Sequence, residues 1–239
     1  MVKYFLSVLI IVFSLSSLFI CSVASNEYGF ETIHLTDDEK QMVWDNLEFK
    51  EINLNSAPEN LGAIVSFDVS EEENIILGTD ENKILVFDKN GAIVSAFEFY
   101  SNGSFYLRAY DDNYLLMLVR SSVIVELTLD GELVGMVRAD DNSSDNNELW
   151  NQQEKNDIYI RENSYVARNK MGLFNLLTSS YSQLVKITDN GSEFVIYDVN
   201  STQLIKIVST FIIILVFLAW AIMVIFKKGK SGKCSVIEL

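Results

Sequence analysis

The sequence reads ILVFDKNGAIVS at residues 84–95, IVELTLDGELVG at residues 124–135 and LVKITDNGSEFV at residues 184–195. Each of these stretches contains an apolar, β-branched run, an Asn-Gly or Asp-Gly step, and a second apolar-rich run. Such steps accept the positive φ angles of a tight turn, so each stretch predicts a β-hairpin. The three turns are expected at Asn90-Gly91, Asp130-Gly131 and Asn190-Gly191.

The spacing of these turns predicts the architecture. Their glycines lie 40 and then 60 residues apart, and a period of about 40 residues is typical of four-stranded propeller blades. Two further candidate strands precede each hairpin, at residues 64–69 and 74–78, 105–110 and 114–119, and 158–161 and 165–169. The sequence therefore predicts a mainly β fold with about three propeller-like, four-stranded blades.

Three blades make an open or incomplete propeller, because closed propellers have at least four. The pattern leaves three arrangements open: an open stack of blades, extra strands supplied by Phe49–Leu54, or a ring completed by two chains as a homodimer. A short helix is expected at Asp37–Asn46, because Thr36-Asp-Asp-Glu39 forms a capping box ahead of apolar residues at helical spacing. We expect the segment Phe30–Ala57 to pack on the blades as a lid.

The repeated units resemble bacterial β-propeller repeats of the NHL type, in which a strand ending in Phe-Asp meets Asn-Gly. The clearest match is Val86-Phe-Asp-Lys-Asn-Gly91, and the resemblance covers about Ala63–Asn200. It points to a bacterial membrane-anchored, propeller-like family of unknown function. Repeats of this kind imply a binding scaffold and no particular activity.

Two segments are far more apolar than the rest of the chain. Residues 1–24 combine Lys3, an apolar run and a small-residue end, which predicts a secretory signal peptide, with an uncleaved anchor as the alternative. Ile207–Phe226 holds twenty uncharged residues, enough for a helix of about 30 Å that crosses a bilayer. Lysines follow at once, so the basic tail at residues 227–239 is expected in the cytoplasm and residues 25–203 outside.

The composition of this predicted extracytoplasmic domain limits its partners. Residues 25–203 carry 32 Asp and Glu against 12 Lys and Arg, so the domain repels nucleic acid and anionic lipid. The two cysteines, Cys21 and Cys234, both lie outside it, which excludes disulfides and Cys-based metal sites there. Small secreted animal domains usually rely on disulfides, so we expect the cell membrane of a Gram-positive-type bacterium.

An acidic segment at residues 140–156 separates the second and third units and is interpreted as an inserted surface loop. Its oxygen-bearing side chains alternate as in calcium loops. However, Asp145 stands at the sixth position, where such loops need glycine, and Asn151 stands at the twelfth, where they need Glu. We therefore predict no metal site.

Catalytic signals are absent from the sequence. His34 is the one histidine, and it lies in an extended stretch (Thr32-Ile-His-Leu-Thr36) with no serine motif and no neighbouring metal ligand. This argues against histidine-dependent triads, and a single histidine cannot form a three-histidine zinc site. No phosphate-binding, dinucleotide-binding, nucleophile-elbow or zinc-protease motif occurs. We therefore predict no catalytic, cofactor-binding or metal residues and no enzymatic activity.

The expected function is a membrane-tethered extracytoplasmic module that binds a protein, peptide or cell-envelope component. Its contact with the lipid bilayer is expected through Ile207 to Phe226. The alternative is an accessory subunit of a membrane complex, contacted through this single helix. An extracytoplasmic hydrolase is the least favoured of the three functions.

Overall fold

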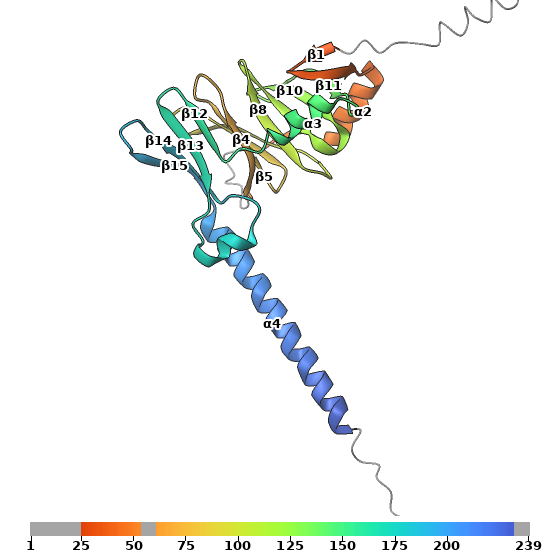
Figure 1. Cartoon of the computed structure of the whole chain (residues 1–239), viewed down its shortest axis with the longest axis vertical. Helices are drawn as coiled ribbons and strands as arrows, with labels where there is room; N and C mark the ends of the chain where they lie inside the picture. Colours follow the sequence, from red (N-terminus) through yellow and green to blue (C-terminus); the bar gives the residue numbers. More distant parts are fainter. Residues whose placement is uncertain (1–24, 54–60, 232–239) are drawn as a thin grey trace, which may run out of the picture.

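The computed structural model describes residues 25–53 and 61–231 (Figure 1). The predicted signal peptide at residues 1–24 and residues 232–239 of the predicted tail lie outside the described residues. The described chain is mainly β, with three antiparallel sheets, short helices and one long C-terminal helix, which confirms the predicted fold class.

Each sheet contains one four-stranded, up-and-down meander, here called a blade. The first blade comprises β4 to β7, at Ile64–Val69, Ile75–Thr79, Lys83–Phe87 and Ile93–Glu98. The second comprises β8 to β11, at Phe105–Tyr110, Asn113–Leu118, Val123–Thr128 and Leu133–Ala139, with a 3₁₀ turn η1 at Val119–Ser121. The third comprises β12 to β15, at Asp157–Ile160, Asn163–Arg168, Gln183–Ile187 and Glu193–Asp198.

The three predicted hairpins are present, but their turns differ from the expected two-residue type. The glycines have φ angles of 81° at Gly91, 81° at Gly131 and 79° at Gly191, while the preceding Asn or Asp stays at negative φ. The Gly91 amide donates to the Asp88 carbonyl, and a bulge follows. This is a longer loop in which only the last turn residue is left-handed. It needs glycine there because a Cβ disfavours that conformation.

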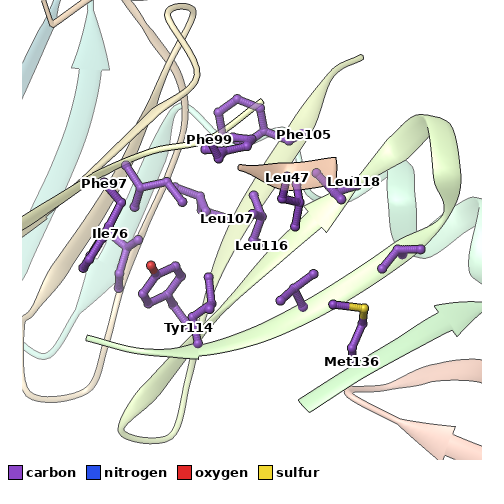
Figure 2. Close-up of a cluster of buried hydrophobic side chains, with 14 of the residues drawn as sticks. Leu47, Ile76, Phe97, Phe99, Phe105, Leu107, Tyr114, Leu116, Leu118 and Met136 are labelled. Atoms are coloured by element: carbon purple, nitrogen blue, oxygen red, sulfur yellow. The ribbon is translucent and has the colours of Figure 1, made fainter. Parts of the chain in front are cut away.

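The blades stack in the order third, first, second, so the first blade is covered on both faces (Figure 1). Its strand β4 lies beside β8 of the second blade and beside β12 of the third. Figure 2 shows the core between the first and second blades, where Ile76 and Phe97 of the first blade face Leu107 and Leu116 of the second. The opposite face of the first blade packs on Tyr165 and neighbouring residues of the third.

The described part of the predicted lid, residues 30–53, packs on the blades, and residues 54–57 lie outside the described residues. Helix α2 spans Asp37–Leu47, one residue beyond the prediction, and has the predicted capping box. Leu47 at its end is buried in the core between the first two blades, where it appears in Figure 2. Phe49 follows and stacks on Phe97 with ring centroids 5.1 Å apart. Leu35 and Leu47 are therefore core residues, and Val43, Trp44 and Phe49 pack against this core, whereas Met42 is exposed.

The same segment also extends two sheets. Strand β3 (Lys50–Glu51) pairs with β7 of the first blade. Strands β1 (Ser25–Glu27) and β2 (Phe30–His34) form a hairpin that pairs with β11 of the second blade. The expectation that Phe49–Leu54 adds strands holds for Lys50–Glu51, but these strands cover sheet edges and do not build a further blade.

The acidic segment at residues 140–156 is not simply the loop that we expected, because it contains helix α3 (Ser144–Asn151). The Ser143 hydroxyl accepts a hydrogen bond from the Asn146 amide and caps the helix. The Asn146 side chain is buried and bonds to the Glu31 backbone on β2. Trp150 packs on Phe30 with ring centroids 5.3 Å apart. The helix forms because a serine cap and an apolar pair override a composition typical of loops.

Helix α4 (Asn200–Ser231) begins two residues after β15 ends, so no extended linker separates the third blade from it. At 1.5 Å per residue its 32 residues extend about 48 Å. Within the described part of the chain it is the one helix long and apolar enough to cross a membrane, and its most apolar window is not buried by the domain. The predicted span 207–226 lies wholly inside it.

Candidate interaction surface on the third blade

The three hairpin turns differ in what they touch, although their sequences repeat. A Cβ placed on Gly131 would lie 2.4 Å from the Phe97 ring of the first blade. A Cβ on Gly91 would lie 3.6 Å from Ile196 of the third blade. A Cβ on Gly191 would meet no described atom within 4 Å. The turns of the second and first blades therefore each pack on the next sheet in the stack, and the turn of the third blade has no such neighbour.

Polar contacts follow the same pattern. The Ser95 hydroxyl of the first blade donates to the Leu129 carbonyl at the turn of the second, at 2.6 Å. The Lys186 ammonium of the third blade lies 3.5 Å from the Lys89 carbonyl at the turn of the first. The hydrogen bonds at the turn of the third blade stay within residues 188–192.

The sheet edges show the same difference. The outer edge of the second blade is covered by β2, and that of the first by β3. In the described ranges, no strand pairs with the outer edge of β15. An uncovered edge presents unpaired backbone groups to any added strand.

One face of the third blade is also open. Tyr165, Ala167, Leu184 and Tyr197 point into the core shared with the first blade. Because strand side chains alternate between faces, their neighbours along the strands point away from it. We call this the open face and define it by Tyr159, Val166, Arg168 and Val195. Tyr159 is 74% exposed and Val195 54% exposed, so the face carries apolar surface.

Arg168 links three strands of the open face through hydrogen bonds. Its guanidinium reaches from β13 across β14 to the Glu193 carboxylate on β15, with N–O distances of 2.6 and 3.3 Å. Its Nε donates to Gln183 at 3.0 Å on the way. On β14, Val185 lies between Gln183, which pairs with Arg168, and Ile187, which pairs with Glu193. Val185 is fully buried. The hydrogen bond from Arg168 lowers the pKa of Glu193, so the pair stays charged at neutral pH.

A buried polar cluster helps to fix the third blade to the first. The Glu73 carboxylate, at the β4–β5 turn, accepts hydrogen bonds from Tyr165 at 2.8 Å, from Asn163 at 3.0 Å, and from the Lys186 ammonium. The side chains of Lys186 and Glu73 are only 15% and 14% exposed. The hydrogen bond from Lys186 lowers the pKa of Glu73. This contact holds the open face in a defined orientation relative to the rest of the domain.

A polar cleft of about 560 Å³ lies at the ends of β4 and β8 and is lined by Asp68, Arg108 and several further acidic residues. Burial raises the pKa of Asp68, a pattern that is common at functional sites. Its carboxylate, however, accepts from the backbone amides of Val69 and Ala109, both at 3.0 Å. The bond from Ala109 joins the second blade to the first and the bond from Val69 is local, so the buried carboxylate has a structural role.

His34 and Asp140, from the parts of the chain considered above for catalysis and calcium binding, make local contacts. His34 is exposed, with its Nε2 3.8 Å from a Glu27 carboxylate oxygen. No group of three or more potential metal-ligating side chains occurs in residues 25–53 and 61–231. Asp140, in the segment tested as a calcium loop, instead accepts hydrogen bonds from Asn142.

The sequence did not identify the open face. Tyr159 and Val195 look like ordinary strand residues in the sequence. A blade that packs between two others is apolar on both faces, so an apolar residue does not reveal which face is uncovered. A signal was nevertheless present: Val166, Val185 and Val195 form an apolar row on the face that points away from the first blade.

Comparisons with known proteins add little to this geometry. No family model and no curated protein matches the chain. Solved structures with similarity include a streptogramin B lyase (16% identity, 65% of this chain, 46% of that one, TM-score 0.29). Others are BamB from Moraxella catarrhalis (17%, 53%, 34%, TM-score 0.24) and Sqt1 from Saccharomyces cerevisiae (12%, 57%, 31%, TM-score 0.27). The chain spans less than half the length of each of these three structures. Likeness at this level assigns no function to the chain.

Proposed function

We propose that the chain is a non-enzymatic, membrane-tethered interaction module whose open face binds a protein partner. One observation carries the proposal: the turn and the outer edge of the third blade lack the neighbours that the corresponding parts of the first and second blades have. Its turn, its outer edge and its open face are all left without a neighbour among the described residues. The chain thus presents a prepared surface where a propeller would continue.

The chemistry of this surface suits protein recognition. Tyrosine and arginine are the residues that most often dominate protein–protein interfaces, because each offers a large contact area together with directional polar groups. Tyr159 of β12, Arg168 of β13 and the apolar side chain of Val195 of β15 lie on the same face of the sheet. The Arg168–Glu193 pair holds the guanidinium in place before binding, which reduces the entropy lost on association.

Helix α4 is proposed to anchor the module in the cell membrane as a single span. The lysines that follow residue 226 place the C-terminal tail in the cytoplasm by the positive-inside rule. Residues 25–203 then lie outside, at the surface of a Gram-positive-type bacterium, as in a membrane-anchored protein of NHL-type repeats. Protease added to intact protoplasts should remove this domain, and its protection would contradict the orientation.

The binding role is tested by photocrosslinking in native membranes. A photoreactive amino acid replaces Val195 on the open face. The matched control replaces Val134 on β11, which is 53% exposed on the second blade. We expect one discrete adduct from position 195 and none from position 134. Equal adducts at both positions, or none at either, would contradict the proposal.

The same experiment separates the alternatives. An adduct of twice the chain mass identifies a second copy of the chain as the occupant of the open face. A partner crosslinked only from positions in α4, and never from position 195, supports the accessory-subunit function. In that case the single helix, and not the open face, makes the contact.

A further inference from the structure

The segment between β13 and β14 carries exposed apolar residues next to the start of α4. It contains the 3₁₀-helix η2 (Gly172–Leu177), where Leu173 and Leu176 are each 88% exposed. Residues three apart in a 3₁₀-helix lie in line, because this helix has three residues per turn. The two leucines therefore form one apolar ridge.

The segment that carries this ridge is hydrogen-bonded at both of its ends to Asn200, the first residue of α4. The Lys170 amide donates to the Asn200 side-chain oxygen at 3.1 Å, and the Ser182 hydroxyl donates to the same atom. Figure 1 shows the segment beside the first turns of α4, beyond the ends of the strands. The predicted span begins at Ile207, about 10 Å along the helix from Asn200. The ridge thus lies at the level where the headgroup region should begin.

The segment is ordered by its own amide side chains. The Asn175 side chain accepts from the Met171 amide at 2.8 Å. The Asn169 side chain donates to Thr178 at 3.1 Å and to the Ser180 carbonyl at 3.0 Å. Internal bonds of this kind matter at a membrane, because backbone groups that leave water need partners within the protein. Met171 is buried, so the exposed leucines are not simply part of an unpacked loop.

The absence of charge in this segment favours lipid as the partner of the ridge. Residues 171–181 (MGLFNLLTSSY) contain no charged side chain, although the chain carries a net charge of −15. An uncharged apolar ridge beside a membrane-length helix fits the neutral boundary between lipid headgroups and acyl chains. The first turns of α4 also contact the first blade, because the Lys206 ammonium lies 2.9 Å from the Glu81 carboxylate.

We propose that η2 inserts Leu173 and Leu176 into the outer leaflet of the bilayer that α4 crosses. The proposal rests on the membrane anchoring proposed above. The third blade then meets the membrane at two points, α4 and η2, instead of swinging on one helix. The open face, which belongs to the same blade, is thereby held at a fixed angle and height above the lipid.

The test measures the depth of spin labels in the full-length chain. Cys21 and Cys234 are replaced by serine, and single cysteines at Leu173, Leu176, Tyr159 or Val216 carry a nitroxide in phosphatidylcholine vesicles. Depth is read from the ratio of collisions with oxygen to collisions with a water-soluble nickel chelate. We expect a several-fold higher ratio at Leu173 and Leu176 than at Tyr159, and the highest ratio at Val216.

The outcomes distinguish this inference from the anchoring itself. If Val216 lies in lipid while both leucine positions match Tyr159, the insertion of η2 is wrong and the anchor stands. If Val216 also gives the water value, both are wrong. As a second check, Leu173→Asp with Leu176→Asp should move a label at Ser179 to the water value and leave Val216 unchanged. No change at Ser179 would contradict insertion through the leucines.

Discussion

The second and third blades share one repeat but end in opposite ways. The second blade has its turn packed on Phe97, its edge paired with β2, and its outer core covered by Phe30 and Trp150. The third blade has none of these among the described residues, and it is joined to the first through a buried polar cluster as well as an apolar core. The comparison shows that the N-terminal segment and α3 cover the second blade, at one end of the stack. The end next to α4 is left open.

The largest expected effect concerns the Glu73–Lys186 contact. Lys186→Met should destabilise the domain by about 3–5 kcal/mol, because it leaves the Glu73 carboxylate largely buried without its cation. Glu73→Gln combined with Lys186→Met should recover part of this loss. The measurement is chemical denaturation of the full-length chain in detergent. A double variant no more stable than Lys186→Met alone would show that the two side chains are not coupled.

The same contact gives the stability of the third blade a pH dependence. The pKa of Glu73 is lower in the folded chain than its ordinary value of 4.5, so the unfolded state binds a proton more readily than the folded state. The stability from this group is fully present above about pH 4.5 and is lost as pH falls through the lower, folded pKa. The Glu73→Gln variant should lose this part of the acid sensitivity, while a wild-type acid profile in that variant would contradict the assignment.

The second effect compares two glycines with nearly identical φ angles. Gly191→Ala should cost about 1–2 kcal/mol, the penalty for a Cβ in the left-handed region. Gly131→Ala should cost a further 1–3 kcal/mol or so, because its Cβ also meets the buried Phe97 ring. Thermal melting of the two variants checks the difference. Equal losses would mean that the turns of the second and third blades are equally free of neighbours.

The third effect concerns the cover of the second blade. Trp150→Ala should destabilise the domain by about 2 kcal/mol, since it uncovers Phe30 and the outer core. The matched substitution on the third blade, Tyr159→Ala, should change stability by less than about 0.5 kcal/mol, because that side chain is largely exposed. Comparable losses in urea denaturation would show that the open face is already covered in the free chain.

Much of the fold follows from local signals in the sequence. The Asn-Gly and Asp-Gly steps, the 40-residue period and the capping box at Thr36 gave three blades and helix α2 nearly to the residue. Helix α3 was missed because Ser143 and the apolar pair at Leu149 and Trp150 were outweighed by an acidic composition. The turn type was missed because Asn-Gly and Asp-Gly fit both a two-residue turn and a longer one, and the bulge that decides between them depends on strand pairing.

The candidate site could not be predicted in the same way. The open face depends on which sheets lie next to one another, and the stack order third, first, second is not the order in the chain. The Glu73–Lys186 contact joins residues 113 positions apart, a pairing that no local pattern contains. Two traces in the sequence could have been recognised: the apolar row Val166, Val185 and Val195, and Leu173 and Leu176 in an uncharged stretch before an apolar helix.

The central claim is that the third blade is open in the free chain and covered in the cell membrane. Hydrogen–deuterium exchange of the amides of β15 and of β11 tests it directly, in the purified full-length protein and in native membranes. We predict that β15 exchanges faster than β11 in the purified protein, and that β15 alone becomes protected in native membranes. Equal protection of both strands in the purified protein, or no gain at β15 in membranes, would contradict the account.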